Sequence, residues 1–201
     1  MIRRFRYHFY RWLARTIWWF FGGVDVIGLH HVPASGPCLI ICNHQSYLDP
    51  ILTQAFCPRI IHAMAKSTQF GSRLFRRLLT QVYAFPVRRF EVDPQAVRQV
   101  LRRLQQGNAV AIYIEGERSW DGQLQPPRLG TVRLGLKAGV PIIPCRISGA
   151  YEAWPRWDRK IKRSHIRIEF REPFHFPQLD SRAVREAHVA DAADRIMASL
   201  R

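Results

Sequence analysis

The sequence predicts an α/β fold: a single-domain layered sheet flanked by helices, with an amphipathic helix at the amino end. Two observations carry this prediction. Short apolar runs alternate with amphipathic stretches from residue 24 onward, which is typical of a layered α/β domain. The chain has 201 residues, 47% of them hydrophobic, which is enough for one domain with a full core. We therefore expect an amino-terminal helix in residues 1–23 and one domain in residues 24–201.

The amino-terminal segment is predicted to be an aromatic, arginine-rich interfacial helix. One helical stripe consists of Phe5, Phe9, Trp12, Thr16 and Trp19, and a neighbouring stripe consists of Arg4, Arg11 and Arg15. The apolar stretch that ends at Gly22-Gly23 is too short to span a bilayer, and no signal-peptide cleavage pattern is present. A position in the plane of a membrane interface fits best. The alternative is that the aromatic stripe packs on the domain, and both roles are compatible.

The first half of the domain is predicted to contain four strands and three helices. Cys38 to Cys42 is apolar throughout, as expected of a buried strand, and Asp93-Pro94 is a favourable helix start. The other expected strands are 24–29, 59–64 (ending at Lys66) and 83–87. The expected helices are 50–56, 70–80 and the one from residue 93 to Gly107, where Val97, Val100, Leu101 and Leu104 point inward.

The second half repeats this alternation. Strands are expected at 109–114, 141–147 and 166–170, and helices at 130–138 and 181–200. Gly139 follows the first of these helices at the position where glycine commonly ends a helix. The closing helix has Val184, Val189, Ile196 and Leu200 among its apolar positions.

The charge is strongly basic, with 31 Lys and Arg against 15 Asp and Glu, a net charge of +16. Of the basic residues 27 are Arg, so the partner is expected to be anionic: nucleic acid, an acidic lipid surface or a phosphorylated substrate. The four cysteines form no Cys-x-x-Cys pair or zinc pattern, so we expect buried free thiols and no metal site.

The segment Asn43-His44-Gln45-Ser46-Tyr47-Leu48-Asp49-Pro50 carries the clearest chemistry. The segment follows a predicted buried strand. The imidazole of His44 can accept a proton near neutral pH, and the carboxylate of Asp49 can fix its tautomer. Asp49 also stands before Pro50, where a helix N-cap belongs, so a purely structural role is the alternative. Polar residues follow two further strands as well, namely Arg88, Arg89, Glu115, Glu117 and Arg118. Because ligands bind at the carboxyl ends of such strands, we expect one joint site.

These residues also resemble a known family. Asn43 to Asp49 resembles the first signature of the glycerolipid acyltransferases (1-acyl-glycerol-3-phosphate and lysophospholipid acyltransferases) that make phosphatidic acid. Glu115-Gly116-Glu117-Arg118-Ser119 resembles their Glu-Gly-Thr-Arg-Ser block, and Val140 to Pro144 resembles their Val-Pro-Ile-x-Pro segment. Two departures concern Arg88, where the family often has an acidic residue, and Glu117, which replaces threonine. The resemblance covers about Val24 to Ile147 and implies the glycerolphosphate-acyltransferase fold.

The resemblance implies a reaction and a set of site residues. His44 would be the general base that takes the proton of a lysophospholipid hydroxyl as it attacks an acyl thioester, and Asp49 would hold His44. The substrate-binding positions would be Lys66, Arg89, Glu115, Gly116 and Arg118. No cofactor or metal is implied, and the acyl donor would be acyl-coenzyme A or acyl-carrier protein. No Gly-x-Ser-x-Gly elbow supplies a nucleophile, although Ser46 is a local alternative.

Other functions fit fewer of these features. A nucleic-acid-binding protein or a non-catalytic basic membrane-surface protein would explain the charge but not the motifs. A hydrolase that activates water with His44 and Asp49 is the nearest catalytic alternative. We therefore expect a peripheral or monotopic membrane enzyme on the cytoplasmic face of the cell membrane, with 1-acyl-glycerol 3-phosphate as the favoured acceptor. Glycerol 3-phosphate and other lysolipids remain alternative acceptors.

Overall fold

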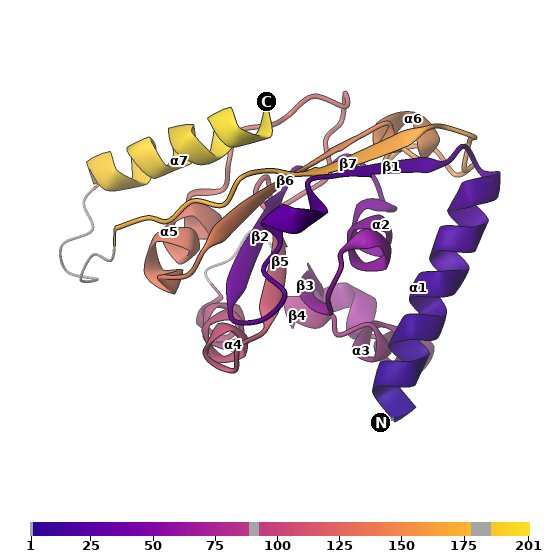
Figure 1. The fold of residues 1–201 in the computed structure, drawn as a ribbon, viewed down its shortest axis with the longest axis horizontal. Helices are drawn as coiled ribbons and strands as arrows, with labels where there is room; N and C mark the ends of the chain where they lie inside the picture. The colour runs from indigo at the N-terminus through magenta and orange to yellow at the C-terminus, as the bar shows by residue number, and fades with distance from the viewer. Residues whose placement is uncertain (1, 89–92, 178–185) are drawn as a thin grey trace.

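The computed structural model describes residues 2–88, 93–177 and 186–201, and these residues form a seven-stranded sheet with helices on both faces (Figure 1). The strands lie in the order β1-β7-β6-β2-β5-β3-β4, and every neighbouring pair is parallel except β6 with β7. The predicted layered α/β fold is therefore confirmed. The strands are β1 (Val24–Ile27), β2 (Cys38–Cys42), β3 (Ile61–Lys66), β4 (Phe85–Val87), β5 (Ala109–Tyr113), β6 (Ile142–Ser148) and β7 (Ile166–Phe170).

The helices are α1 (Ile2–Phe20), α2 (Asp49–Phe56), α3 (Arg73–Gln81), α4 (Pro94–Gln105), α5 (Leu129–Ala138), α6 (Ala150–Ala153) and α7 (Glu186–Leu200). The sequence predicted all of them except the four-residue α6, because a single turn has no periodicity to recognise. It also missed the short 3-10 segments η1 (Leu29–His31) and η2 (Ser67–Phe70). The amino-terminal part of the predicted closing helix, including Val184, lies outside the described residues.

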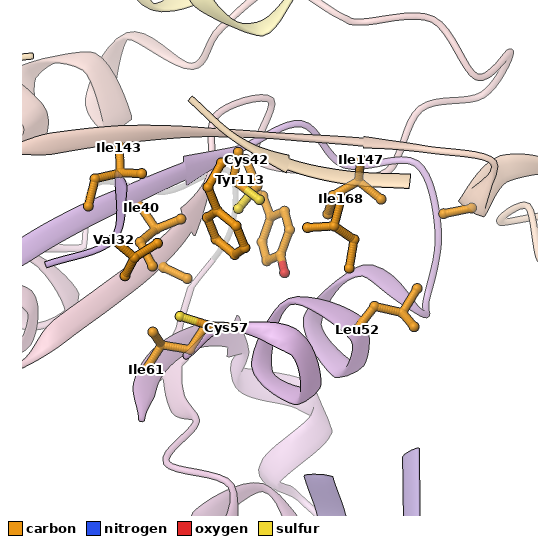
Figure 2. Close-up of a cluster of buried hydrophobic side chains, with 14 of the residues drawn as sticks. Val32, Ile40, Cys42, Leu52, Cys57, Ile61, Tyr113, Ile143, Ile147 and Ile168 are labelled. Atoms are coloured by element: carbon orange, nitrogen blue, oxygen red, sulfur yellow. The ribbon is translucent and has the colours of Figure 1, made fainter. Parts of the chain in front are cut away.

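Each face of the sheet has its own core, and β2 contributes to both. Cys38, Ile40 and Cys42 pack in the cluster that includes Leu52 of α2. Leu39 and Ile41 pack on the opposite face, in the cluster formed with α4, α5 and α7. Burial on both faces explains why the whole strand is apolar. Figure 2 shows the first of these cores, with Tyr113 of β5 pointing from the sheet toward α2.

The four cysteines are free and buried, as predicted. Burial raises the pKa of the Cys38 and Cys57 thiols to about 11, so both are protonated at neutral pH. They act as small apolar side chains of the core.

Helix α1 packs against α2 with one side and exposes the predicted aromatic stripe on the other. Tyr7 and Trp18 are buried in the contact. Arg11 and Arg15 donate hydrogen bonds to the Ala55 carbonyl, and Arg11 also donates to the Cys57 carbonyl. These carbonyls lie at the carboxyl end of α2, where the helix dipole favours cations. The exposed apolar residues include Phe5, Phe9, Trp12 and Trp19. Among the described residues, no helix is long and apolar enough to cross a membrane.

Candidate active site

The carboxyl ends of β2 and β5 bring the two main motifs together. The strands are parallel neighbours, with Cys42 beside Tyr113 at their ends. Asn43-His44 therefore leaves β2 next to Ile114-Glu115, which leaves β5. The backbone continues the pairing, because the Ile114 amide donates to the Cys42 carbonyl at 2.9 Å. The predicted convergence of these motifs at one edge of the sheet is thus seen directly.

His44 and Asp49 form a buried pair. Nδ1 of His44 lies 2.7 Å from Oδ2 of Asp49, and the two residues are only 4% and 0% exposed. The same Oδ2 accepts hydrogen bonds from the amides of Gln45 and Ser46 at 2.6 and 2.8 Å. A carboxylate held by two amides presents a fixed acceptor to the imidazole, which sets the ring orientation and places the proton on Nδ1.

The alternative role of Asp49 as an N-cap is wrong. Helix α2 begins at Asp49 itself, Leu48 occupies the N-cap position, and no side chain caps the helix there. The physical reason lies in the preceding turn, whose amides and imidazole all point at the Asp49 carboxylate. The side chain therefore turns back from the helix that it opens.

Three hydrogen bonds join the His44 turn to the loop after β5. The His44 amide donates to Oε1 of Glu115 at 2.8 Å, and the Ser119 amide donates to the His44 carbonyl at 2.8 Å. Nε2 of Gln45 donates to the Gly122 carbonyl at 2.6 Å. The Glu115 carboxylate thus fixes the backbone of the residue that carries the imidazole.

Gly116 allows the loop to leave the strand so sharply. Its φ angle is +73°, a left-handed conformation that side chains rarely adopt. A Cβ at this position would also lie 2.7 Å from Cγ of Arg128. The glycine therefore serves the turn through its backbone.

Two side chains that the sequence prediction missed hold His44 in place. The ring of Tyr113 stacks on the His44 imidazole, with 4.3 Å between centroids and 29° between planes. Asn43 exchanges two hydrogen bonds with the backbone of Ile147 in β6, at 2.8 and 2.7 Å. The position of Tyr113 could have been found from strand periodicity, because residues 109, 111 and 113 alternate toward the α2 face. No sequence signal indicates the partner of Asn43.

Burial sets the electrostatics of Glu115. Its removal from water raises the pKa of the carboxyl from 4.5 to about 7, and the nearby Asp49 contributes in the same direction. The hydrogen bond from the His44 amide opposes the rise. Near neutral pH, Glu115 is therefore present partly as the neutral carboxylic acid and partly as the carboxylate.

Arg118 reaches the same region from the loop after Glu115. Its guanidinium carbon lies 3.4 Å from the centre of the Tyr47 ring, a cation–π contact, and burial lowers its pKa. In the described part of the chain, four buried polar atoms of the two motifs have no hydrogen-bond partner: Nε of Arg118, Oε1 of Gln45, Oδ1 of Asp49 and Oε2 of Glu115. Such a cluster is expected where a polar ligand completes the site.

Lys66 and Arg88 belong to the part of the sheet that lies beyond β5, away from β2. Lys66 ends β3, which β5 separates from β2, and its side chain is exposed. Arg89 lies outside the described residues. The amide of Arg88 donates to Oδ2 of Asp93 at 2.8 Å, and Oδ1 of Asp93 caps α4 as predicted.

Ser46, the local alternative nucleophile, is held by structural hydrogen bonds. Its hydroxyl donates to the Trp154 carbonyl at 2.7 Å and accepts from the Leu48 amide at 3.1 Å. The residue is fully buried, which suits a turn support and not a nucleophile. Across the described ranges, no group of three or more His, Cys, Asp or Glu side chains could hold a metal ion.

An apolar cavity of about 630 Å³ adjoins the His44 turn. Tyr47 and Pro50, on either side of Leu48-Asp49, form part of its wall. Most of the remaining wall comes from α1, α2, β3 and α3, and includes Tyr10, Ala14, Ile51, Phe75 and Leu79. A polar site next to a largely apolar cavity suits a substrate with a charged head and a hydrocarbon tail.

Comparisons with known proteins agree with this geometry. A family model described as Acyltransferase matches residues 23–148. The 1-acyl-sn-glycerol-3-phosphate acyltransferase of Bacillus subtilis is 28% identical over 155 residues, which are 77% of this chain and 75% of that protein. A chloroplastic 1-acyl-sn-glycerol-3-phosphate acyltransferase of Brassica napus is 28% identical over 186 residues, or 89% of this chain. The chain spans only about half of that second relative, 53% of its length.

A solved structure shows the same fold. The crystal structure of the 1-acyl-sn-glycerophosphate (LPA) acyltransferase PlsC from Thermotoga maritima superposes with a TM-score of 0.77 at 20% sequence identity. The match covers 99% of this chain and 82% of that one. At this identity the likeness establishes the arrangement of the sheet and helices.

Proposed function

Because the chain belongs to the acyltransferase family, we propose that it moves a fatty acyl group from an acyl thioester to the free hydroxyl of a 1-acyl-glycerol 3-phosphate, which gives phosphatidic acid. The family match confirms the resemblance seen in the sequence motifs. The two relatives from Bacillus and Brassica are named for this acyl acceptor. The observation that carries the proposal is the buried His44–Asp49 pair, joined by hydrogen bonds to the loop of Glu115 and Arg118.

His44 is proposed to act as the general base. With the proton on Nδ1 directed at Asp49, the lone pair of the neutral ring is on Nε2, which takes the hydroxyl proton of the acceptor. The hydroxyl oxygen bonds to the thioester carbonyl carbon, and the carbon–sulfur bond of the resulting tetrahedral intermediate breaks. The imidazolium returns its proton to the departing thiolate. The thioester is already activated, so no acyl-enzyme is needed.

The acceptor phosphate is proposed to bind at Arg118, with Lys66 and Arg89 as further cationic positions. A guanidinium suits phosphate because two of its N–H groups can bind two oxygens at once. Nε of Arg118 is buried and has no hydrogen-bond partner among the described residues, and this supports the assignment. Glu115 and Gly116 shape the loop that presents Arg118.

The acyl chain is proposed to lie in the apolar cavity next to Tyr47 and Pro50. Helix α1, which forms part of the wall, exposes Phe5, Phe9, Trp12 and Trp19 on its outer side. Aromatic residues favour the membrane interface, so α1 is proposed to hold the enzyme on the bilayer as a peripheral or monotopic protein at the cytoplasmic face. An enzyme placed there receives a membrane lipid without carrying it through water.

A thiol-release assay tests the proposal. Acyl-coenzyme A and acyl-carrier protein are each combined with 1-acyl-glycerol 3-phosphate, glycerol 3-phosphate or lysophosphatidylcholine. We expect thiol release with the first acceptor and formation of phosphatidic acid. The variant His44→Ala should lower the rate by about 100- to 10,000-fold with its circular dichroism spectrum unchanged.

Each other outcome has a defined meaning. Thiol release with no acceptor present would indicate a hydrolase. Release only with glycerol 3-phosphate or lysophosphatidylcholine would move the acceptor to the alternative classes. A wild-type rate in His44→Ala would remove the base assignment.

A further inference from the structure

Helix α3 exposes an apolar face that no other described part of the chain covers. Leu74, Phe75 and Leu78 are 64%, 57% and 39% exposed, and no residue of the helix is buried. Leu78 follows Leu74 by four residues and Phe75 by three, so it neighbours both and the three side chains share one side of the helix. An amphipathic helix in a soluble domain normally turns its apolar side to the core. The apolar side of α3 therefore needs a partner outside the domain.

Helix α3 lies beside α1. A guanidinium nitrogen of Arg3 in α1 donates to the Thr80 carbonyl of α3 at 2.5 Å. Tyr10 and Ile17 follow Arg3 at successive seven-residue intervals, so they lie along the same flank of α1. Tyr10 and Phe75 both contribute to the wall of the apolar cavity. The two helices thus border one cavity, and Figure 1 shows α3 near the amino-terminal half of α1.

The opposite side of α3 is strongly basic. It presents Arg73, Arg76 and Arg77, all exposed, and the helix contains no acidic residue. Long arginine side chains can extend along an apolar surface and place their guanidinium groups at lipid phosphates. A partner that is apolar at depth and anionic at its surface matches both sides of the helix. An anionic lipid bilayer has this structure, and the net charge of +16 favours it further.

We propose that α3 is a second membrane-binding element, which inserts Leu74, Phe75 and Leu78 into an anionic bilayer beside α1. The cavity between the two helices then opens toward the acyl region of the lipid. A lysolipid acceptor enters it sideways from the membrane, with its phosphate left at the level of the arginines. This entry route rests on the proposed function, whereas the insertion of α3 does not.

Site-directed labelling tests the insertion. The four native cysteines are fully buried, so Leu74→Cys provides one accessible thiol for a polarity-sensitive dye. Vesicles of equal parts phosphatidylglycerol and phosphatidylcholine should shift its emission to the blue. The matched control is Leu129→Cys on α5, which belongs to the opposite face of the sheet and is 52% exposed. No shift at position 74, or an equal shift at both positions, would overturn the proposal.

Vesicle binding measures the contribution of the face. The double variant Leu74→Ser/Leu78→Ser keeps α1 intact and changes only exposed side chains, so folding should be unaffected. We expect its partitioning onto the same vesicles to fall by about tenfold or more, because apolar burial drives interfacial binding. Leu129→Ser should bind as the wild type does. Arg77→Glu should weaken binding more than Arg102→Glu on α4, and more so at low salt.

The outcomes separate this proposal from its rivals. If the double variant binds vesicles normally but changes from dimer to monomer in sedimentation, the face is an interface between two copies and the proposal is wrong. Activity on a short-chain lysophosphatidate below its micelle concentration tests the enzyme without a membrane. Loss of vesicle binding with this soluble activity retained supports insertion of α3. An inactive wild type with α3-dependent binding would refute the proposed function alone.

Discussion

Replacing Glu115 with glutamine should change how the stability of the fold depends on pH. The folded protein holds the proton of Glu115 up to about pH 7, whereas an unfolded chain releases it near pH 4.5. Between these values the folded state binds more protons than the unfolded state. The free energy of unfolding of the wild type therefore falls as pH rises through this window, and above it Glu115 causes no further change with pH.

The magnitude follows from the two pKa values. A pKa raised from 4.5 to about 7 corresponds to about 3 kcal/mol in total, most of which falls between pH 5 and pH 8. Glu115 is only 3% exposed, so screening by solvent reduces this little. Glutamine has no proton to lose, and its carbonyl oxygen can still accept the hydrogen bond from the His44 amide.

The assay is urea unfolding of both proteins at pH 5, 6, 7 and 8. Glu115→Gln should gain about 2–3 kcal/mol relative to the wild type across this range, with most of the gain below pH 7. Glu172→Gln is the matched control, because it removes an exposed carboxylate, and its difference from the wild type should stay constant. A pH-independent difference for Glu115→Gln would refute the reasoning, since burial would then not hold the proton on this carboxyl.

Three further changes test the site and the fold. Asp49→Asn should lower kcat by about 100- to 10,000-fold with little change in either KM, because an uncharged amide replaces the carboxylate that accepts the hydrogen bond of His44. Steady-state kinetics measures both constants. Arg118→Ala should raise the KM of the phosphorylated acceptor by about 10- to 100-fold, and Arg118→Lys should recover part of this loss. A larger effect on the KM of the thioester donor would assign Arg118 to the donor instead. Gly28→Ala should lower the free energy of unfolding in urea by about 1–3 kcal/mol or more, because a Cβ there would lie 1.8 Å from the Phe170 carbonyl oxygen. Gly36→Ala is the control and should lower it less, because a Cβ there has no atom within 4 Å.

The sheet could be predicted from sequence because buried positions form recognisable apolar patterns along the chain. Strand β2 is apolar at every position since both of its faces are covered, and α4 shows its cap at Asp93 and its apolar face in one window. The 3-10 segment before α3 has no such pattern, so the predicted helix began three residues early, at Phe70. Local patterns thus identify elements well and their ends less well.

The site was predictable where its chemistry lies within one segment or directly follows the end of a strand. His44 and Asp49 are five residues apart, and the sequence predicted their pairing. Contacts between distant segments were only partly predictable: no signal indicates that Asn43 binds Ile147, 104 residues away, and periodicity gives the face of Tyr113 but not its stacking on His44. These contacts depend on the order of strands in the sheet, which periodicity does not specify. The N-cap interpretation of Asp49 was wrong because Oδ2 of its carboxylate binds the turn before the helix, and the helix already begins at Asp49.

Glu117, which stands where the family has threonine, acquires a role from such a distant contact. Its carboxylate pairs with Arg156 at 3.1 Å and with Arg128 at 3.4 Å. Arg156 also donates to the Arg118 carbonyl at 2.9 Å and lies over the Trp120 ring. A partly exposed pair contributes little to stability, but this one positions the Arg156 guanidinium that holds the backbone of Arg118. The substitution therefore changes how the loop is supported, so Glu117 gives no reason to expect a different head group on the acceptor.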